Sequence, residues 1–151
     1  MADLKARLQA DLNAAMKARD ELTTATLRMT LTAVTTEEVA GKAARELSDQ
    51  DVLKVIAREA KKRRESAEAY AAAGRPELAE RERAEGEVLA GYLPAQLDDA
   101  ELSRLVAEAV AEVGASGMRD MGAVMKTVQP RVAGRADGKR VSDEVRRQLA
   151  G

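Results

Sequence analysis

Between residues 92 and 99 the chain reads YLPAQLDD, and this stretch decides how the sequence divides. Pro94 ends the helix that precedes it, because proline has no backbone N–H to donate within a helix. Asp98 and Glu101 then have the spacing of a capping box, which starts a new helix. We therefore expect a boundary here, between a four-helix region at 1–93 and a three-helix domain at 94–151.

Apolar residues recur every three or four positions on both sides of this boundary, a pattern typical of helices with one buried face. Gly74 and Pro76 mark a helix end followed by a helix start. Strand-forming residues are sparse, and Phe and Trp are absent, so we predict an all-α protein. It should consist of an N-terminal helical bundle followed by a small three-helix C-terminal domain. The apolar stripes that predict its helices lie at 4–16, 27–34, 52–70, 76–92, 102–113, 118–130 and 141–149.

The composition excludes several kinds of chemistry. The 151 residues include no Cys and no His, so disulfides, thiol catalysis and the commonest metal ligand are ruled out. The 25 Lys and Arg nearly balance 26 Asp and Glu, so no overall charge attracts nucleic acid or a membrane. The charged N-terminus has no apolar signal-peptide region, and no window approaches a membrane span. We expect a cytoplasmic protein with no membrane partner, no metal and no cofactor.

A run of four cations stands in AKKRRES, residues 60–66. It has the composition of a nucleic-acid or targeting patch. However, an antiparallel hairpin closed at Gly74 would bring Arg63 and Arg64 opposite Glu85 and Glu87. The pattern therefore favours a neutralised helix face over a functional patch.

Charge is segregated more sharply near the C-terminus. Residues 98–117 hold five acids and one base, whereas residues 118–151 hold eight bases and four acids. A helical projection of the last helix puts its four cations in one arc, opposite its apolar stripe, although Asp143 interrupts that arc. These four are Lys139, Arg140, Arg146 and Arg147.

The turn between Gly134 and Gly138 has two interpretations. Free N–H groups at a helix start attract anions, and Gly138 would let a phosphate approach the backbone. Asp137, however, is well placed as the N-cap, where its carboxylate would occupy those donors. Gly134 is more simply a helix end, and the spacing alone favours a structural turn.

Five blocks of the sequence together resemble one known family, the standalone YqeY-like proteins. These blocks are TLRM (26–29), AKKRRESAEAY (60–70), EVLAGYLPAQL (87–97), GASGMRDMGAVM (114–125) and GRADGKRVSDEVRRQL (134–149). The family, GatB/YqeY, shares a domain with the tail of the B subunit of glutamine-dependent aspartyl/glutamyl-tRNA amidotransferase, where that tail helps to engage tRNA. The chain departs from the family in TTEEVAGKAARE (35–46), which is richer in Thr and Ala than the charged segment expected there.

The resemblance implies a non-catalytic accessory protein that contacts tRNA through a basic C-terminal face. The contact carries over to the C-terminal cations that match the tail domain, provided that these cations project into solvent without neighbouring acids to neutralise them. They are Lys126, Arg131, Arg135, Lys139 and Arg140, with Arg146 and Arg147 as further candidates.

Two other functions remain open. The protein could be an interaction module that docks on an amidotransferase or another complex through Met118, Met121 and Met125, because Met-rich faces adapt to partners. It could also have carbon–nitrogen ligase activity with glutamine as amido donor, as the family association suggests. No glycine-rich nucleophile setting and no Walker-type loop occurs in the sequence, so we expect no catalytic residues and no such activity from this chain alone.

Overall fold

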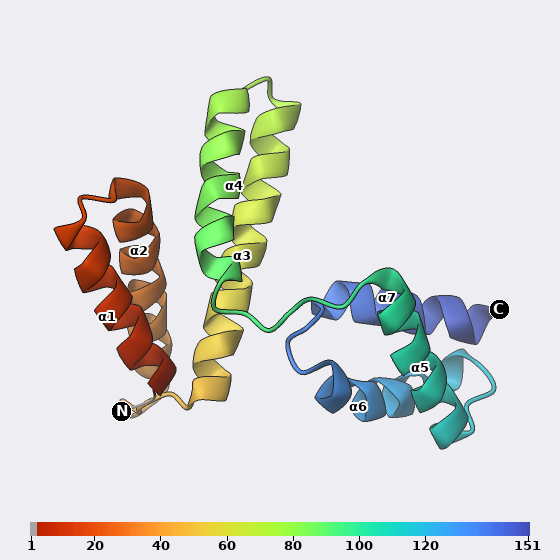
Figure 1. Ribbon diagram of the computed structural model, residues 1–151. Helices are drawn as coiled ribbons and strands as arrows, with labels where there is room; N and C mark the ends of the chain where they lie inside the picture. Colours follow the sequence, from red (N-terminus) through yellow and green to blue (C-terminus); the bar gives the residue numbers. More distant parts are fainter. Residues whose placement is uncertain (1–2) are drawn as a thin grey trace. The chain divides into compact units, whose positions relative to one another are not determined.

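A computed structural model of the chain describes residues 3–151. Across these residues it contains seven α-helices and one short 3-10 helix, and no strand, which confirms the predicted all-α class (Figure 1). The helices belong to two compact units: Met1–Leu93, the N-terminal unit, and Pro94–Gly151, the C-terminal unit. None of the described helices is both long and apolar enough to cross a membrane.

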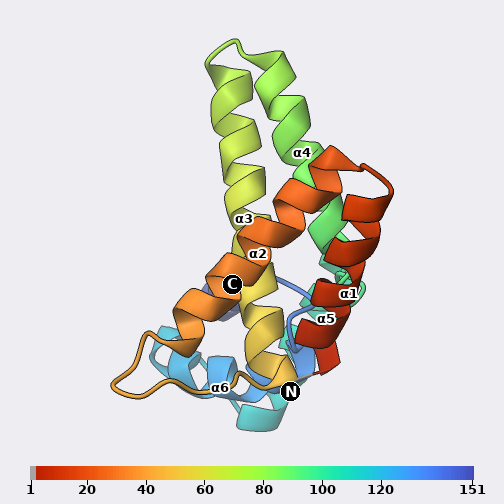
Figure 2. The same ribbon diagram turned by 90° about the vertical axis from the view of Figure 1, so that its left-hand side faces the viewer.

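The N-terminal unit pairs two helical hairpins. The first comprises α1 (Asp3–Lys17) and α2 (Glu21–Glu38), and the second comprises α3 (Asp49–Ala72) and α4 (Pro76–Ala90). Figures 1 and 2 show α3 and α4 side by side, with their connecting turn extending beyond the first hairpin. The first turns of α3 and the end of α4 share an apolar core with α1 and α2, which includes Leu8, Leu27, Ile56 and Leu89.

The helix boundaries follow from local chemistry. The Asp20 carboxylate accepts from the Thr23 N–H at the start of α2, and the Ser48 hydroxyl accepts from the Asp51 N–H at the start of α3. Gly74 adopts a left-handed conformation with φ of 73°, and Pro76 occupies the start of α4. The predicted end and start signals at these two residues are therefore confirmed.

Threonine is a poor helix former, yet α2 contains seven threonines. Four of the hydroxyls donate to the carbonyl four residues earlier in the helix, at 2.8 to 2.9 Å. These bonds let threonine sit within a helix without an unsatisfied donor. The four are Thr26, Thr30, Thr32 and Thr36.

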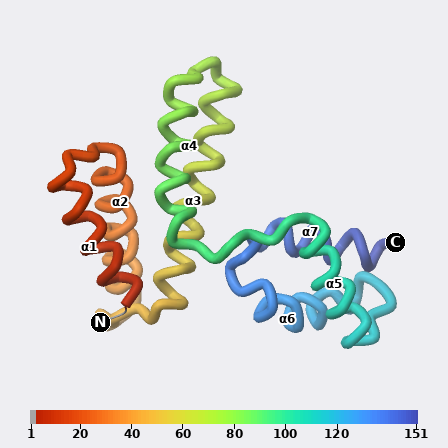
Figure 3. Tube along the Cα trace, in the orientation of Figure 1, coloured from red at the N-terminus to blue at the C-terminus, as the bar shows by residue number. Residues whose placement is uncertain are grey.

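The C-terminal unit packs three helices around one small core, and Figure 3 follows their path. They are α5 (Asp99–Val113), α6 (Met121–Val132), preceded by the 3-10 turn η1 (Met118–Asp120), and α7 (Gly138–Ala150). The predicted capping box is present: Asp98 accepts from the Glu101 N–H and Glu101 accepts from the Asp98 N–H. Val106, Val124, Val128, Val141 and Val145 are fully buried in the core.

The apolar stripe at 118–130 predicts a helix that stops at Pro130, and this prediction is wrong. Helix α6 continues through Pro130 to Val132. Proline removes one hydrogen bond, to the carbonyl of Lys126, but both residues are exposed, so water can satisfy that carbonyl. The helix ends instead where Ala133 and Gly134 turn left-handed, with φ of 46° and 80°.

Candidate nucleic-acid interface

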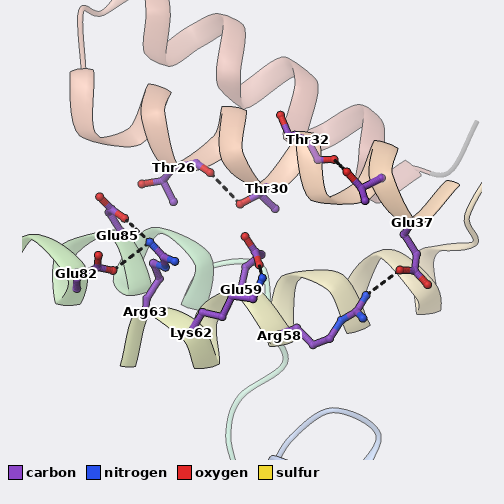
Figure 4. Close-up of polar contacts among 11 residues, drawn as sticks. Thr26, Thr30, Thr32, Glu37, Arg58, Glu59, Lys62, Arg63, Glu82 and Glu85 are labelled. Atoms are coloured by element: carbon purple, nitrogen blue, oxygen red, sulfur yellow. Dashed lines mark hydrogen bonds and ion pairs between the residues drawn. The ribbon is translucent and has the colours of Figure 1, made fainter. Parts of the chain in front are cut away.

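The basic run of residues 60–66 lies on α3, and Figure 4 draws Lys62 and Arg63 of this run with their partners. Arg63 points to α4, where one guanidinium nitrogen lies 3.1 Å from Glu82 and 3.3 Å from Glu85. The expected pairing of Arg63 with Glu85 is thus confirmed, while that of Arg64 with Glu87 remains a prediction. Arg81 also pairs with Glu85, at 3.2 Å.

Two carboxylates that pair with cations of the basic run are almost completely buried. Glu59 and Glu85 each expose only 6% of their surface. Glu59 is paired with the exposed Lys62 at 3.0 Å, and Glu85 with the two arginines just described. Because a buried carboxylate needs a cation or donor beside it, this part of the run serves the interior of the N-terminal unit.

The C-terminal cations fall into two groups, and in the first a carboxylate lies beside each guanidinium. Arg140 lies 3.0 Å from Asp99, Arg146 lies 3.1 Å from Asp143, and Arg147 lies 2.6 Å from Glu144. Arg131 is paired with Glu112. For these four side chains the condition that they project without neutralising acids is not met.

In the second group, the positive charge has no counterion among the described residues. Lys126 and Lys139 are exposed, and within residues 3–151 neither lies within ion-pair distance of a carboxylate. Arg135 is partly buried and its Nε donates to the neutral carbonyl of Ala95 at 3.2 Å, which leaves its charge uncompensated. These three cations lie on α6, on the turn that follows it and at the start of α7.

The glycine turn acts as a structural turn, as the spacing favours. The Asp137 carboxylate accepts from the Arg140 N–H at 2.9 Å, so it caps α7 as predicted. The sequence did not indicate that Ala133 also adopts a left-handed conformation, because an alanine there carries no signal for positive φ.

Residues 95–97 are joined to this turn by hydrogen bonds that sequence reasoning missed. The Leu97 N–H donates to the Arg135 carbonyl at 2.8 Å, and Arg140 donates to the Leu97 carbonyl at 3.0 Å. The Gln96 amide donates to the carbonyls of Pro94, at 3.0 Å, and Gly134, at 3.3 Å. No local pattern predicts contacts between segments about forty residues apart; only their shared place in the fold reveals them.

A groove of about 620 Å³ lies between α5 and α7. Arg140, Glu144 and Arg147 line it from α7, and Ser103 from α5. Hydrogen bonding from Arg147, supported by Gln148 and Ser103 and opposed by partial burial, lowers the pKa of Glu144 from 4.5 to about 2. The groove is therefore lined by guanidinium groups that already face carboxylates.

Glu144→Gln should lower the free energy of unfolding by about 1 kcal/mol at pH 7, after allowance for solvent screening of this ion pair. The pKa of Glu144 is lower in the folded protein, so its contribution is complete above pH 4.5 and is lost as the pH falls toward 2. Urea unfolding followed by far-UV circular dichroism at pH 7, 4 and 2 measures the difference. An exposed control, Asp143→Asn, should change stability by less than about 0.5 kcal/mol. A difference for Glu144→Gln that does not shrink with acid would contradict this assignment.

The three methionines proposed for docking are not equivalent. Met121 and Met125 are partly buried and pack against the core of the C-terminal unit. Met118, in η1, is 47% exposed. Two of the three side chains thus contribute to the interior, which leaves little apolar surface for a partner at this position.

In residues 3–151 no group of three or more His, Cys, Asp and Glu side chains is arranged to hold a metal ion. The described residues form a small all-helical protein with two compact units. It belongs to the family of Yqey-like proteins, whose model matches residues 5–149, so the family resemblance of the sequence is confirmed. The search of curated proteins found no match.

Proposed function

We propose that this protein is a non-catalytic accessory factor that contacts tRNA through backbone phosphates with its C-terminal unit. The observation that supports the proposal is the uncompensated charge of Lys126, Arg135 and Lys139. The resemblance to the tail domain of a glutamine-dependent tRNA amidotransferase supports tRNA as the partner. With such a partner the protein would act in the cytoplasm.

Phosphate contact suits this surface better than base recognition. Both tyrosines, Tyr70 and Tyr92, lie in the N-terminal unit, and the chain has no Phe or Trp. The C-terminal unit therefore has no aromatic side chain on which a base could stack, which leaves shape and phosphate contacts. Exposed ion pairs contribute only about 0–1 kcal/mol, so a phosphate can compete for Arg131 and Arg140 as well.

Binding of unmodified tRNA should weaken with salt because each phosphate contact releases a counterion. Three contacts predict a slope of about −2 to −3 in a plot of log affinity against log salt concentration. The double variant Lys126→Gln/Lys139→Gln should reduce the slope by about 1.5 to 2 and weaken binding at low salt. Fluorescence anisotropy with labelled tRNA at several salt concentrations measures both quantities.

The matched control is Lys17→Gln/Lys42→Gln, which removes the same charge from two exposed lysines of the N-terminal unit. Its slope should equal that of the unchanged protein. The proposal fails if the protein does not bind tRNA at low salt, or if both double variants lose the same affinity and slope.

A further inference from the structure

Arg135 is held at both ends by the segment that enters the C-terminal unit. Its backbone carbonyl accepts from the Leu97 N–H at 2.8 Å, and its side-chain Nε donates to the Ala95 carbonyl at 3.2 Å. Between these two residues stands Gln96, whose amide donates to the carbonyls of Pro94 and Gly134. The bond to Gly134 reaches the residue immediately before Arg135.

The bond to Ala95 uses only one N–H donor of the Arg135 guanidinium group. Arginine has five N–H donors, and here a neutral acceptor occupies the Nε donor. Within residues 3–151 the terminal nitrogens of Arg135 have no acceptor, so they and the positive charge can meet another one. A phosphate oxygen is the acceptor that such a planar pair of donors fits best.

The contacts of Arg135 also fix its conformation before any ligand arrives. A long cationic side chain loses rotamer freedom when it is immobilised at an interface, which weakens binding. Lys126 has no partner within residues 3–151 and must lose that freedom on binding, whereas Arg135 is already oriented. Preorganisation of this kind should make Arg135 the stronger of the two phosphate contacts.

The turn itself needs a support from outside. Ala133 and Gly134 both have positive φ, and a left-handed conformation is unfavourable for alanine. Gly134 is exposed, and its carbonyl accepts the Gln96 amide. Gln96 thus braces the turn formed by Ala133 and Gly134, whose direction decides where Arg135 points.

We propose that Gln96 is a positioning residue for RNA contact: it braces the turn at Gly134 so that the guanidinium of Arg135, anchored on Ala95, presents its remaining donors to a phosphate. The inference rests on the proposed function. It assigns to YLPAQL, at 92–97, a role beyond separating two groups of helices.

A double-mutant cycle on tRNA affinity tests this role. Gln96→Ala should weaken binding about three- to tenfold, the worth of one lost hydrogen bond that orients a contact. In the background of Arg135→Gln the same change should have no further effect, whereas its effect should add fully to that of Lys126→Gln. A residue that merely stabilised the unit would not couple to Arg135 alone.

Gln129→Ala, at an exposed glutamine of α6, is the matched control and should leave affinity unchanged. Reciprocal linkage gives a second measurement on the unchanged protein: saturating tRNA should slow hydrogen exchange at the Leu97 amide. Equal additivity of Gln96→Ala with both cation variants, or unaltered Leu97 exchange in bound protein, would overturn the role of Gln96 alone. Absence of tRNA binding by the unchanged protein would overturn the proposed function with it.

Discussion

Arg63→Met should lower the free energy of unfolding of the N-terminal unit by about 2–4 kcal/mol. The substitution keeps an unbranched apolar stem but leaves Glu85, which is 6% exposed, with Arg81 as its remaining partner. It also removes the cation paired with Glu82. Loss of one member of a buried ion pair commonly costs about 3–5 kcal/mol, because the other charge stays buried. The Nε of Arg63 is itself buried without a hydrogen-bond partner in the described part of the chain, which reduces the expected loss.

Tyrosine fluorescence during urea unfolding measures this change selectively, since both tyrosines belong to the N-terminal unit and the chain has no tryptophan. Lys61→Met provides the control, because Lys61 belongs to the same basic run and forms no ion pair within residues 3–151. Its effect should stay within about 0.5 kcal/mol. Equal losses of stability from the two substitutions would mean that the basic run is a solvated helix face. The ion pairs of Arg63 would then stabilise the unit no more than Lys61 does.

Val106→Asp should unfold the C-terminal unit while the N-terminal unit stays folded. Val106 is fully buried at the centre of the smaller core, and an unpaired carboxylate there costs several kcal/mol. A unit of this size draws only about 3–5 kcal/mol from its core, which such a cost exceeds. The helices of this unit contain about a third of the helical residues, so the far-UV circular dichroism should fall by a similar fraction.

We propose that the two compact units are independently folding domains, and the same experiment tests this proposal. The urea midpoint seen by tyrosine fluorescence should be unchanged in Val106→Asp. Val39→Asp places the same new charge on a side chain that is 59% exposed and should leave both signals as they were. Simultaneous loss of the tyrosine transition in Val106→Asp would show that the units fold as one.

Much of the fold could be predicted because its signals are local. Asp98 with Glu101, Ser48 with Asp51, and Asp137 ahead of α7 each place a side-chain oxygen within reach of a nearby N–H. Helix ends that depend on backbone strain were less predictable. Ala133 has no side-chain feature that favours positive φ. Pro130 is compatible with a helix when the carbonyl that it leaves without a donor faces solvent.

The candidate site was predicted less well, for a physical reason. A cation is recognised in a sequence by its type, but its counterion is decided by the fold. Arg140 meets Asp99 and Arg131 meets Glu112 only because α5 packs against α6 and α7. The charge of Arg135 is not neutralised by a carboxylate in residues 3–151, because its acceptor is a backbone carbonyl. Every residue has such a carbonyl, so no sequence motif identifies this one.

The buried threonines of α2 affect which contacts hold that helix against α3 and α4. Thr26 and Thr30 are completely buried and lie on the side of α2 that faces α3 and α4, close to the two buried glutamates (Figure 4). Their hydroxyl protons are directed to carbonyls of their own helix, so they do not neutralise those carboxylates. Around Thr26 and Thr30, the packing of α2 therefore depends on apolar contact, through Leu27 and Val34, whereas near its end Glu37 pairs with Arg58 of α3 at 3.3 Å. Because apolar association weakens on cooling, the apolar packing of α2 should weaken at low temperature before the ion pairs between α3 and α4 do.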